Sequence, residues 1–221
     1  MVIESQNNEI IRQNLALIEN ERREIAFELH NEIGQNLTAI RTAAQLMHRQ
    51  SEGRQTHPVA KTIVELTDQM FEMMHHLLQR LHPSVLDKFG LADSLEDLVT
   101  FAQENLHLHC TLDIVGDTSV LEKDLQMAVY RIVQEALTNA VRHGYASEAN
   151  IQLVVRADVL DLLVSNNGVA LTGTIDQLIL KKTSGIGLLG ILHRVQAWQG
   201  LIAFENVDEG AKLSCSFPVE S

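Results

Sequence analysis

The stretch from residue 3 to residue 50 contains no proline and a single glycine, Gly34, and this feature most constrains the fold. Apolar residues recur through it at helical spacing: Ile3, Ile10, Leu17; Ile11, Ile18, Ile25; then Leu29, Ile33, Leu37, Ile40, Ala44 and Met47. Steps of seven, or of three and four, mark one face of a helix. The pattern predicts one helix of more than forty residues, typical of a coiled coil or bundle. Asn7 and Asn14 interrupt the seam, so they either set its register or mark a weak seam.

A second helix is predicted after a short turn. Residues 51–58 (SEGRQTHP) are polar and end in a proline that suits the first turn of a new helix. The apolar stripe that follows stops just before Pro83; its members are Val59, Ile63, Leu66, Met70, Met73, Leu77 and Leu81. Two helices joined by a short loop form an antiparallel hairpin. Because one hairpin cannot cover its own stripe, we expect two chains to pair into a homodimeric four-helix bundle.

The rest of the chain mixes helices and strands. We expect helices over 91–106, 121–143 and 187–198, strands over 110–115, 151–155, 160–165, 201–205 and 212–218, and a loop-rich segment over 168–185. This order implies a two-layer α/β sandwich of about 130 residues. The fold class is therefore α+β multidomain, with a coiled-coil helix (1–20), a helical bundle (21–84) and an α/β domain (85–221).

Composition excludes several classes of function. The formal net charge of -12 argues against a nucleic-acid partner, because neutralising phosphates needs clustered Lys and Arg. No apolar stretch approaches the ~20 residues of a membrane span, and the polar start does not resemble a signal peptide. Cys110 and Cys215 do not make a disulfide framework. We therefore expect a cytoplasmic location.

Three polar side chains lie on one face of the predicted helix 121–143. Glu135, Asn139 and Arg142 stand at positions i, i+4 and i+7. A carboxylate, an amide oxygen and a guanidinium along one line suit a magnesium-phosphate group, because hard cations take oxygen ligands and Arg pairs with phosphate. A solvated helix face is the alternative interpretation.

A glycine-rich run, Gly185-Ile-Gly187-Leu188-Leu-Gly190, opens the next predicted helix. Glycines permit close backbone approach, and a helix start presents free amides to phosphate. With Glu205 about twenty residues on, the run also resembles a dinucleotide-binding fingerprint. That interpretation fails because only 31 residues follow Gly190, too few for a doubly wound domain.

Two further motifs are ambiguous by themselves. Asn166-Asn167-Gly168 ends a predicted strand, where a polar side chain could reach the edge of a base, although Asn-Gly is also ordinary turn chemistry. His30 lies about 100° round the long helix from Leu29, so it should flank the stripe and reach solvent. An ordinary surface histidine fits the same pattern.

Together these motifs resemble the bacterial sensor histidine kinases of two-component systems, in the NarX/DesK/UhpB-type subfamily. The resemblance covers about residues 20–219 and rests on five segments in order. They are ERREIAFELHNEIGQNLTAIR for the phosphoacceptor box, LHPSVLDKFGLADSLEDLV for the junction, QEALTNAVRHG for the N box, and NNG and GIGLLGI for the two glycine boxes. The resemblance implies a dimerisation and histidine phosphotransfer domain (HisKA_3) followed by a GHKL (Bergerat) ATP-binding domain.

The resemblance also implies roles for individual residues. His30 would be phosphorylated, and Gln35 would position the water that dephosphorylates a response regulator of NarL/LuxR type. Asn139 would ligate the Mg²⁺ of ATP, with Glu135 placing its water and Arg142 contacting phosphate. The glycine boxes would border the nucleotide through Asn166, Gly168, Gly185, Gly187, Leu188 and Gly190, and residues 169–184 would form a lid. The full-length protein would be anchored in the inner membrane by an N-terminal sensor region.

Two positions depart from the family's pattern. Asn31 stands where the family has an acid after its histidine, and a neutral amide can orient the imidazole but cannot take its proton. Asn166 stands where the first glycine box begins with Asp, and Ala170 replaces that box's second glycine. Asn166 can still accept a hydrogen bond from an adenine amino group. This hydrogen bond lacks the contribution of a charged acceptor, which is worth about 1 kcal/mol.

Three hypotheses follow for the function. The first is ATP-dependent phosphorylation of His30 and transfer to an aspartate of the regulator. The alternative is a kinase-impaired, phosphatase-biased or scaffolding module, since Asn31 and Asn166 replace the usual acids. The third, a GHKL-type ATPase or scaffold without phosphohistidine, is disfavoured because the His30 box is well formed.

Overall fold

The computed structural model describes residues 2–50, 56–169, 185–207 and 210–219, and the chain forms two compact units. One unit is Leu17–Ser84, and the other combines Met1–Ala16 with Val85–Ser221. The predicted lid (169–184) and Ala170 lie almost wholly outside the described residues, as does most of the predicted turn at 51–58.

The predicted long helix is confirmed. Helix α1 runs from Val2 to Gln50 without a break, and helix α2 runs over Thr56–Leu81. Pro58 is the third residue of α2, in the first turn, where its missing N–H has no intrahelical partner to lose. Helix α2 thus begins at Thr56, two residues before that proline.

In the unit Leu17–Ser84, only part of the predicted apolar stripes is buried within one hairpin. The buried side chains are Ala26, Leu37 and Ala44 on α1, and Ala60, Thr67 and Met74 on α2; of these, Leu37 and Ala44 belong to the predicted stripe. Many large apolar residues of the predicted stripes remain exposed instead: Ile25, Ile33, Ile40, Met47, Val59, Leu66, Met70, Met73 and Leu77. Small residues let two helices approach closely, so the larger side chains are displaced to the flank of the hairpin.

The second unit contains a five-stranded sheet of order β1-β2-β3-β5-β4. Its strands are β1 (His109–Val115), β2 (Glu148–Val155), β3 (Val159–Asn166), β4 (Leu201–Val207) and β5 (Gly210–Pro218). Strands β1 and β2 are parallel, and the other pairs are antiparallel. The helices are α3 (Ser84–Phe89), α4 (Leu91–Leu106), the 3-10 helix η1 (Thr118–Val120), α5 (Lys123–Arg142) and α7 (Gly185–Ala197).

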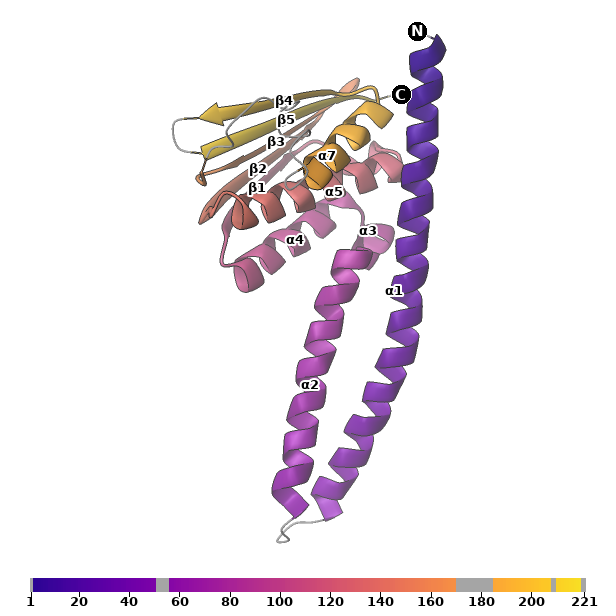
Figure 1. Ribbon diagram of the computed structural model, residues 1–221, viewed down its shortest axis with the longest axis vertical. Coiled ribbons are helices and arrows are strands. Elements are labelled where there is room, and N and C mark those ends of the chain that lie inside the picture. Colours follow the sequence, from indigo (N-terminus) through magenta and orange to yellow (C-terminus); the bar gives the residue numbers. More distant parts are fainter. Residues whose placement is uncertain (1, 51–55, 170–184, 208–209, 220–221) are drawn as a thin grey trace. The chain divides into compact units, whose positions relative to one another are not determined.

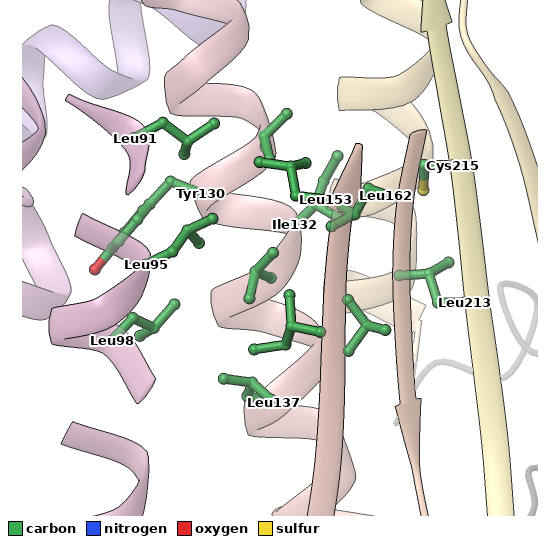
Figure 2. Close-up of a cluster of buried hydrophobic side chains, with 14 of the residues drawn as sticks. Leu91, Leu95, Leu98, Tyr130, Ile132, Leu137, Leu153, Leu162, Leu213 and Cys215 are labelled. Carbon is green, nitrogen blue, oxygen red and sulfur yellow. The ribbon is translucent and has the colours of Figure 1, made fainter. Parts of the chain in front are cut away.

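The helices α4, α5 and α7 cover one face of this sheet (Figure 1). Alternate residues of the strands are buried beneath them, as the period of two requires. Figure 2 shows part of the resulting core, to which Leu95 of α4, Ile132 of α5 and Leu162 of β3 contribute. The predicted two-layer α/β sandwich is confirmed. The short α3 and η1 were not predicted, because elements of three to six residues carry no period.

Candidate functional site

Helix α5 presents the predicted polar face away from the core. Its other side is fully covered, with Ile132, Val133 and Leu137 each at most 1 % exposed. Glu135 and Asn139 are half-buried, and Arg142 is exposed at the last turn. The helix ends there, where the N–H groups of His143 and Gly144 both donate to the Asn139 carbonyl, at 2.9 and 3.2 Å. The three side chains that the sequence places at i, i+4 and i+7 thus lie on one face near the C-terminal end of α5.

The glycine-rich run opens α7 directly against this line. A Cβ atom at Gly187 would overlap the Glu135 carboxylate and would lie 3.4 Å from Asn139 Nδ2. A side chain at this position would therefore require the Glu135 carboxylate to move. Two of the motifs found in the sequence therefore meet in space, and the meeting point is Gly187.

The other predicted residues of α7 lie around that point. Gly185 is the first residue of the helix. Leu188 is half-buried and packs on the hydrophobic core, so it fixes the first turn to the domain. The carbonyl of Gly190 accepts from Arg194 Nη1 at 3.1 Å. The N–H groups of a first helical turn have no intrahelical acceptor, so this end of α7 suits an anion.

The turn after β3 is tied to the same end of α5. Val169 N donates to the carbonyl of Gly144, two residues beyond α5, at 2.7 Å. At Gly168, a Cβ would lie 2.5 Å from that same carbonyl oxygen, so the two loops are in close contact. Asn166 is half-buried, and its Oδ1 accepts from Gly168 N at 3.0 Å. Its amide group points toward the Ala211 carbonyl, 3.5 Å away.

Asn167 has a positioning role that the sequence did not reveal. Its Oδ1 accepts from the backbone N–H groups of Ser147 and Glu148, at 3.0 and 2.9 Å. Its Nδ2 donates to Ser147 Oγ at 3.0 Å. The side chain therefore holds the β3 turn to the start of β2. Asn-Gly gave only a turn signal, and an amide that bonds nearby backbone is the usual reason for Asn in turns.

The phosphoacceptor motif lies on α1 in the other unit. His30 is exposed, as its place beside the stripe predicted, and Gln35 is exposed as well. Asn31 is half-buried. One turn beyond His30, a Cβ at Gly34 would meet Met74 of α2 at 3.8 Å, an ordinary contact. The imidazole thus lies on the surface of α1, accessible to solvent.

Neither cysteine takes part in this chemistry. Burial raises the pKa of Cys110 to about 11 and the pKa of Cys215 to about 12, so both thiols stay protonated at neutral pH. A thiol must ionise to act as a nucleophile. Cys110 on β1 and Cys215 on β5 are separated by two strands, so a disulfide between them is excluded.

The residues gathered by α5, α7 and the β3 turn fit a magnesium nucleotide. Glu135 and Asn139 supply oxygen atoms, Arg142 supplies a guanidinium, and the start of α7 supplies free N–H groups. Because Gly187 lies against Glu135 and has no side chain, no side chain of residue 187 occupies the space beside that carboxylate. The arrangement suits binding of charged phosphate groups beside a hard cation.

Comparison with known proteins agrees with this fold and site. Residues 21–86 match the family described as "Histidine kinase" (HisKA_3), and residues 124–221 match the family described as "Histidine kinase-, DNA gyrase B-, and HSP90-like ATPase". The class is thus a histidine-kinase hairpin joined to an ATPase-type domain. The chain belongs to the sensor histidine kinases of the HisKA_3 type, which confirms the resemblance seen in the sequence.

Individual relatives are also named as histidine kinases. The "Sensor histidine kinase MctS" of Rhizobium johnstonii is 32% identical over 203 residues, which are 90% of this chain and 43% of that protein. The "Signal transduction histidine-protein kinase/phosphatase UhpB" of Salmonella typhimurium is 29% identical over 97% of this chain and 42% of that protein. The solved structure of the Acinetobacter baumannii histidine kinase AdeS is similar in fold, with a TM-score of 0.50 and 17% identity over 72% of this chain and 85% of that chain.

The chain spans less than half the length of these two curated relatives. None of the helices in the described residues is long and apolar enough to cross a membrane. The comparisons give no support to the kinase-impaired alternative raised by Asn31 and Asn166.

Proposed function

We propose that this chain is the transmitter part of a two-component sensor kinase, which phosphorylates its own His30 with ATP and passes the phosphoryl group to an aspartate of a response regulator. One observation carries the proposal: an exposed His30 in a histidine-kinase hairpin accompanies an ATPase-type domain whose Gly187 lies against Glu135 and Asn139. Phosphoryl transfer needs mainly positioning and charge neutralisation, which these groups supply.

In the ATP-binding domain each residue has a binding role. Asn139 would hold Mg²⁺ through its amide oxygen, and Glu135 would orient a water of that ion. Arg142, exposed at the end of α5, would pair with phosphate oxygens. Gly185, Gly187, Leu188 and Gly190 would shape the phosphate cradle, while Asn166 and Gly168 would meet the base. ATP supplies the phosphoryl group.

At the acceptor, the imidazole of His30 would attack the γ-phosphorus of ATP with the lone pair of one ring nitrogen while ADP leaves, and it must lose the proton from the other nitrogen. Asn31 can hold the ring by a hydrogen bond, but an amide is not a base. The proton therefore passes to water or to a group outside the motif. This predicts a slow kinase step rather than an absent one.

The partners follow from the same proposal. A second copy of the chain would cover the exposed apolar side chains of α1 and α2, giving the four-helix bundle. A regulator of the NarL/LuxR type would receive the phosphoryl group. Gln35 is exposed near His30 on α1 and would hold the water that hydrolyses the regulator's acyl phosphate. The anchoring of the full-length protein to the inner membrane remains part of this proposal.

The test is incubation of the chain with radiolabelled ATP and Mg²⁺. Phosphohistidine is acid-labile, so we expect label that is lost in acid and kept in base. The His30→Gln variant should take up no label, whereas Gln35→Ala should label like the parent chain and dephosphorylate the regulator more slowly. Acid-stable label, or equal labelling of His30→Gln, would exclude the proposal.

A further inference from the structure

The start of α1 contacts the ATP-binding domain through one arginine. Residues Met1–Ala16 belong to the same compact unit as Val85–Ser221. Within that unit the guanidinium carbon of Arg12 lies 3.9 Å from the centroid of the Trp198 ring. Arg12 Nη2 also donates to Glu122 Oε2 at 3.4 Å. One side chain thus makes a cation–π contact and an ion pair with two residues that are distant in the sequence.

Both partners of Arg12 stand at the ends of helices that carry the candidate nucleotide site. Glu122 is the N-cap of α5, and Trp198 directly follows α7. The same two helices meet at their other ends, where Gly187 lies against Glu135 and Asn139. They are therefore antiparallel, and Arg12 joins them at the end opposite to the phosphate cradle.

The face of α1 that carries Arg12 shares Ile11 with the predicted heptad pattern, but it does not include Ile10 or Leu17. Asn8, Ile11, Arg12 and Leu15 are half-buried, at the i, i+3, i+4, i+7 spacing of one helix face. Ile10 and Leu17 are 56% and 66% exposed. A second chain can thus pair along Ile10 and Leu17 while Arg12 keeps its contacts with Trp198 and Glu122.

We propose that Arg12 is a latch, which docks the N-terminal part of α1 on the Trp198–Glu122 surface of the ATP-binding domain and so restrains that domain. The proposal rests on the proposed function, because restraint matters only if the domain must travel to His30. While Arg12 is docked, the domain is tied to the segment that precedes the phosphoacceptor histidine. Movement of this segment, as a signal arriving along α1 would produce, releases the domain for the kinase step.

The strength of the two contacts suits a switch. The Arg12 and Glu122 side chains are 38% and 63% exposed, so solvent screens their attraction. A cation–π contact at such a site is also weak. Docked and released arrangements are then close in free energy, and a small input changes their populations. Loss of the latch should raise the released population, and the rate of His30 labelling, by about two- to fivefold.

The experiment uses the full 221-residue chain and its single tryptophan as reporter. In Arg12→Ala, we expect Trp198 emission to shift to longer wavelength, because the ring loses its cover, and His30 labelling by ATP to rise. Arg12→Lys keeps the charge but not the planar stacking group, so its effects should be intermediate. Glu122→Gln removes the ion pair alone and should also raise labelling.

The matched control is Gln13→Ala. Gln13 lies next to Arg12 on the same helix, is exposed, and its Nε2 donates within the helix to Glu9 Oε1 at 3.2 Å. It should leave both Trp198 emission and labelling unchanged. Unchanged emission in Arg12→Ala would show that the segment does not dock. Shifted emission without faster labelling would show docking without restraint, which also overturns the latch. If no variant labels at all, the proposed function fails, while the emission still decides whether the segment docks.

Discussion

At Gly187, the absence of a side chain allows the start of α7 to lie close to Glu135 and Asn139 of α5. Its backbone lies so close to α5 that a Cβ atom would overlap the Glu135 carboxylate. Gly190, three residues on, is less constrained, because an added Cβ would lie 3.2 Å from Arg194 Nη1 and would not overlap it. The two glycines of one motif thus meet different physical demands.

We therefore predict that Gly187→Ala weakens binding of magnesium ATP by about tenfold or more, because the new methyl group displaces Glu135 from its place beside Asn139. Isothermal titration calorimetry measures the affinity. Gly190→Ala should cause a smaller loss, because the Arg194 guanidinium can move away. If Gly187→Ala binds magnesium ATP as tightly as the parent chain, the nucleotide does not bind beside Gly187, Glu135 and Asn139.

Asn31 tests the chemistry of the acceptor. General-base assistance is typically worth about 10²–10⁴-fold, so Asn31→Asp should raise the rate of His30 labelling at least tenfold. The rate of acid-labile incorporation from radiolabelled ATP checks this. Asn31→Ser, which also lacks a base, serves as the control and should not speed labelling. If Asn31→Asp labels no faster than the parent chain, another group takes the proton.

At the scale of elements, α1 is a continuous helix despite the glycine in its middle. An added Cβ at Gly34 would make only an ordinary contact, with Met74 Cε at 3.8 Å. The hydroxyl of Thr38 donates to the Gly34 carbonyl at 2.7 Å. Neither feature of this single chain requires a glycine.

Gly34→Ala should therefore stabilise the hairpin by about 0.5–1 kcal/mol, because alanine loses less backbone entropy in a helix. Urea unfolding followed by circular dichroism measures the free energy of unfolding. Ala39→Gly, at an exposed position of the same helix, should destabilise by a similar amount. A less stable Gly34→Ala would mean that a second chain passes too close for a methyl group.

At the scale of the whole molecule, the hairpin leaves a large apolar surface without cover. Ile40, Leu66 and Met70 are each at least half exposed. Contiguous apolar surface of this kind usually marks an interface in a soluble protein. Its location on both helices favours an isologous pairing of two hairpins.

We predict that the chain sediments as a dimer at micromolar concentration. Met70→Glu should raise the dissociation constant by at least about a hundredfold, because the carboxylate would be buried without a partner. Val120→Glu changes an apolar residue of similar exposure (60%) in the other unit and should leave the dimer intact. A monomeric parent chain at this concentration would rule out the four-helix bundle.

The sequence predicted a helix or strand well where the periodic pattern of apolar residues extended over enough positions. The helix over 91–106 and the strand over 201–205 match α4 and the first part of β4. Strand β2 begins at Glu148, three residues before the expected start. Its first residues alternate weakly, and Asn167 fixes them from outside the strand. The position of that boundary depends on a contact that is not local in sequence.

The sequence alone determined the helical periods, the α/β order, the five motifs and hence the family, because each is a property of neighbouring residues along the chain. Only the tertiary structure decided which apolar stripe the hairpin buries, that Gly187 meets Glu135 and Asn139, and that Arg12 covers Trp198. The physical reason is that packing depends on the sizes of side chains on two elements at once. A spacing pattern shows which face a residue occupies, but it does not show what will lie against that face.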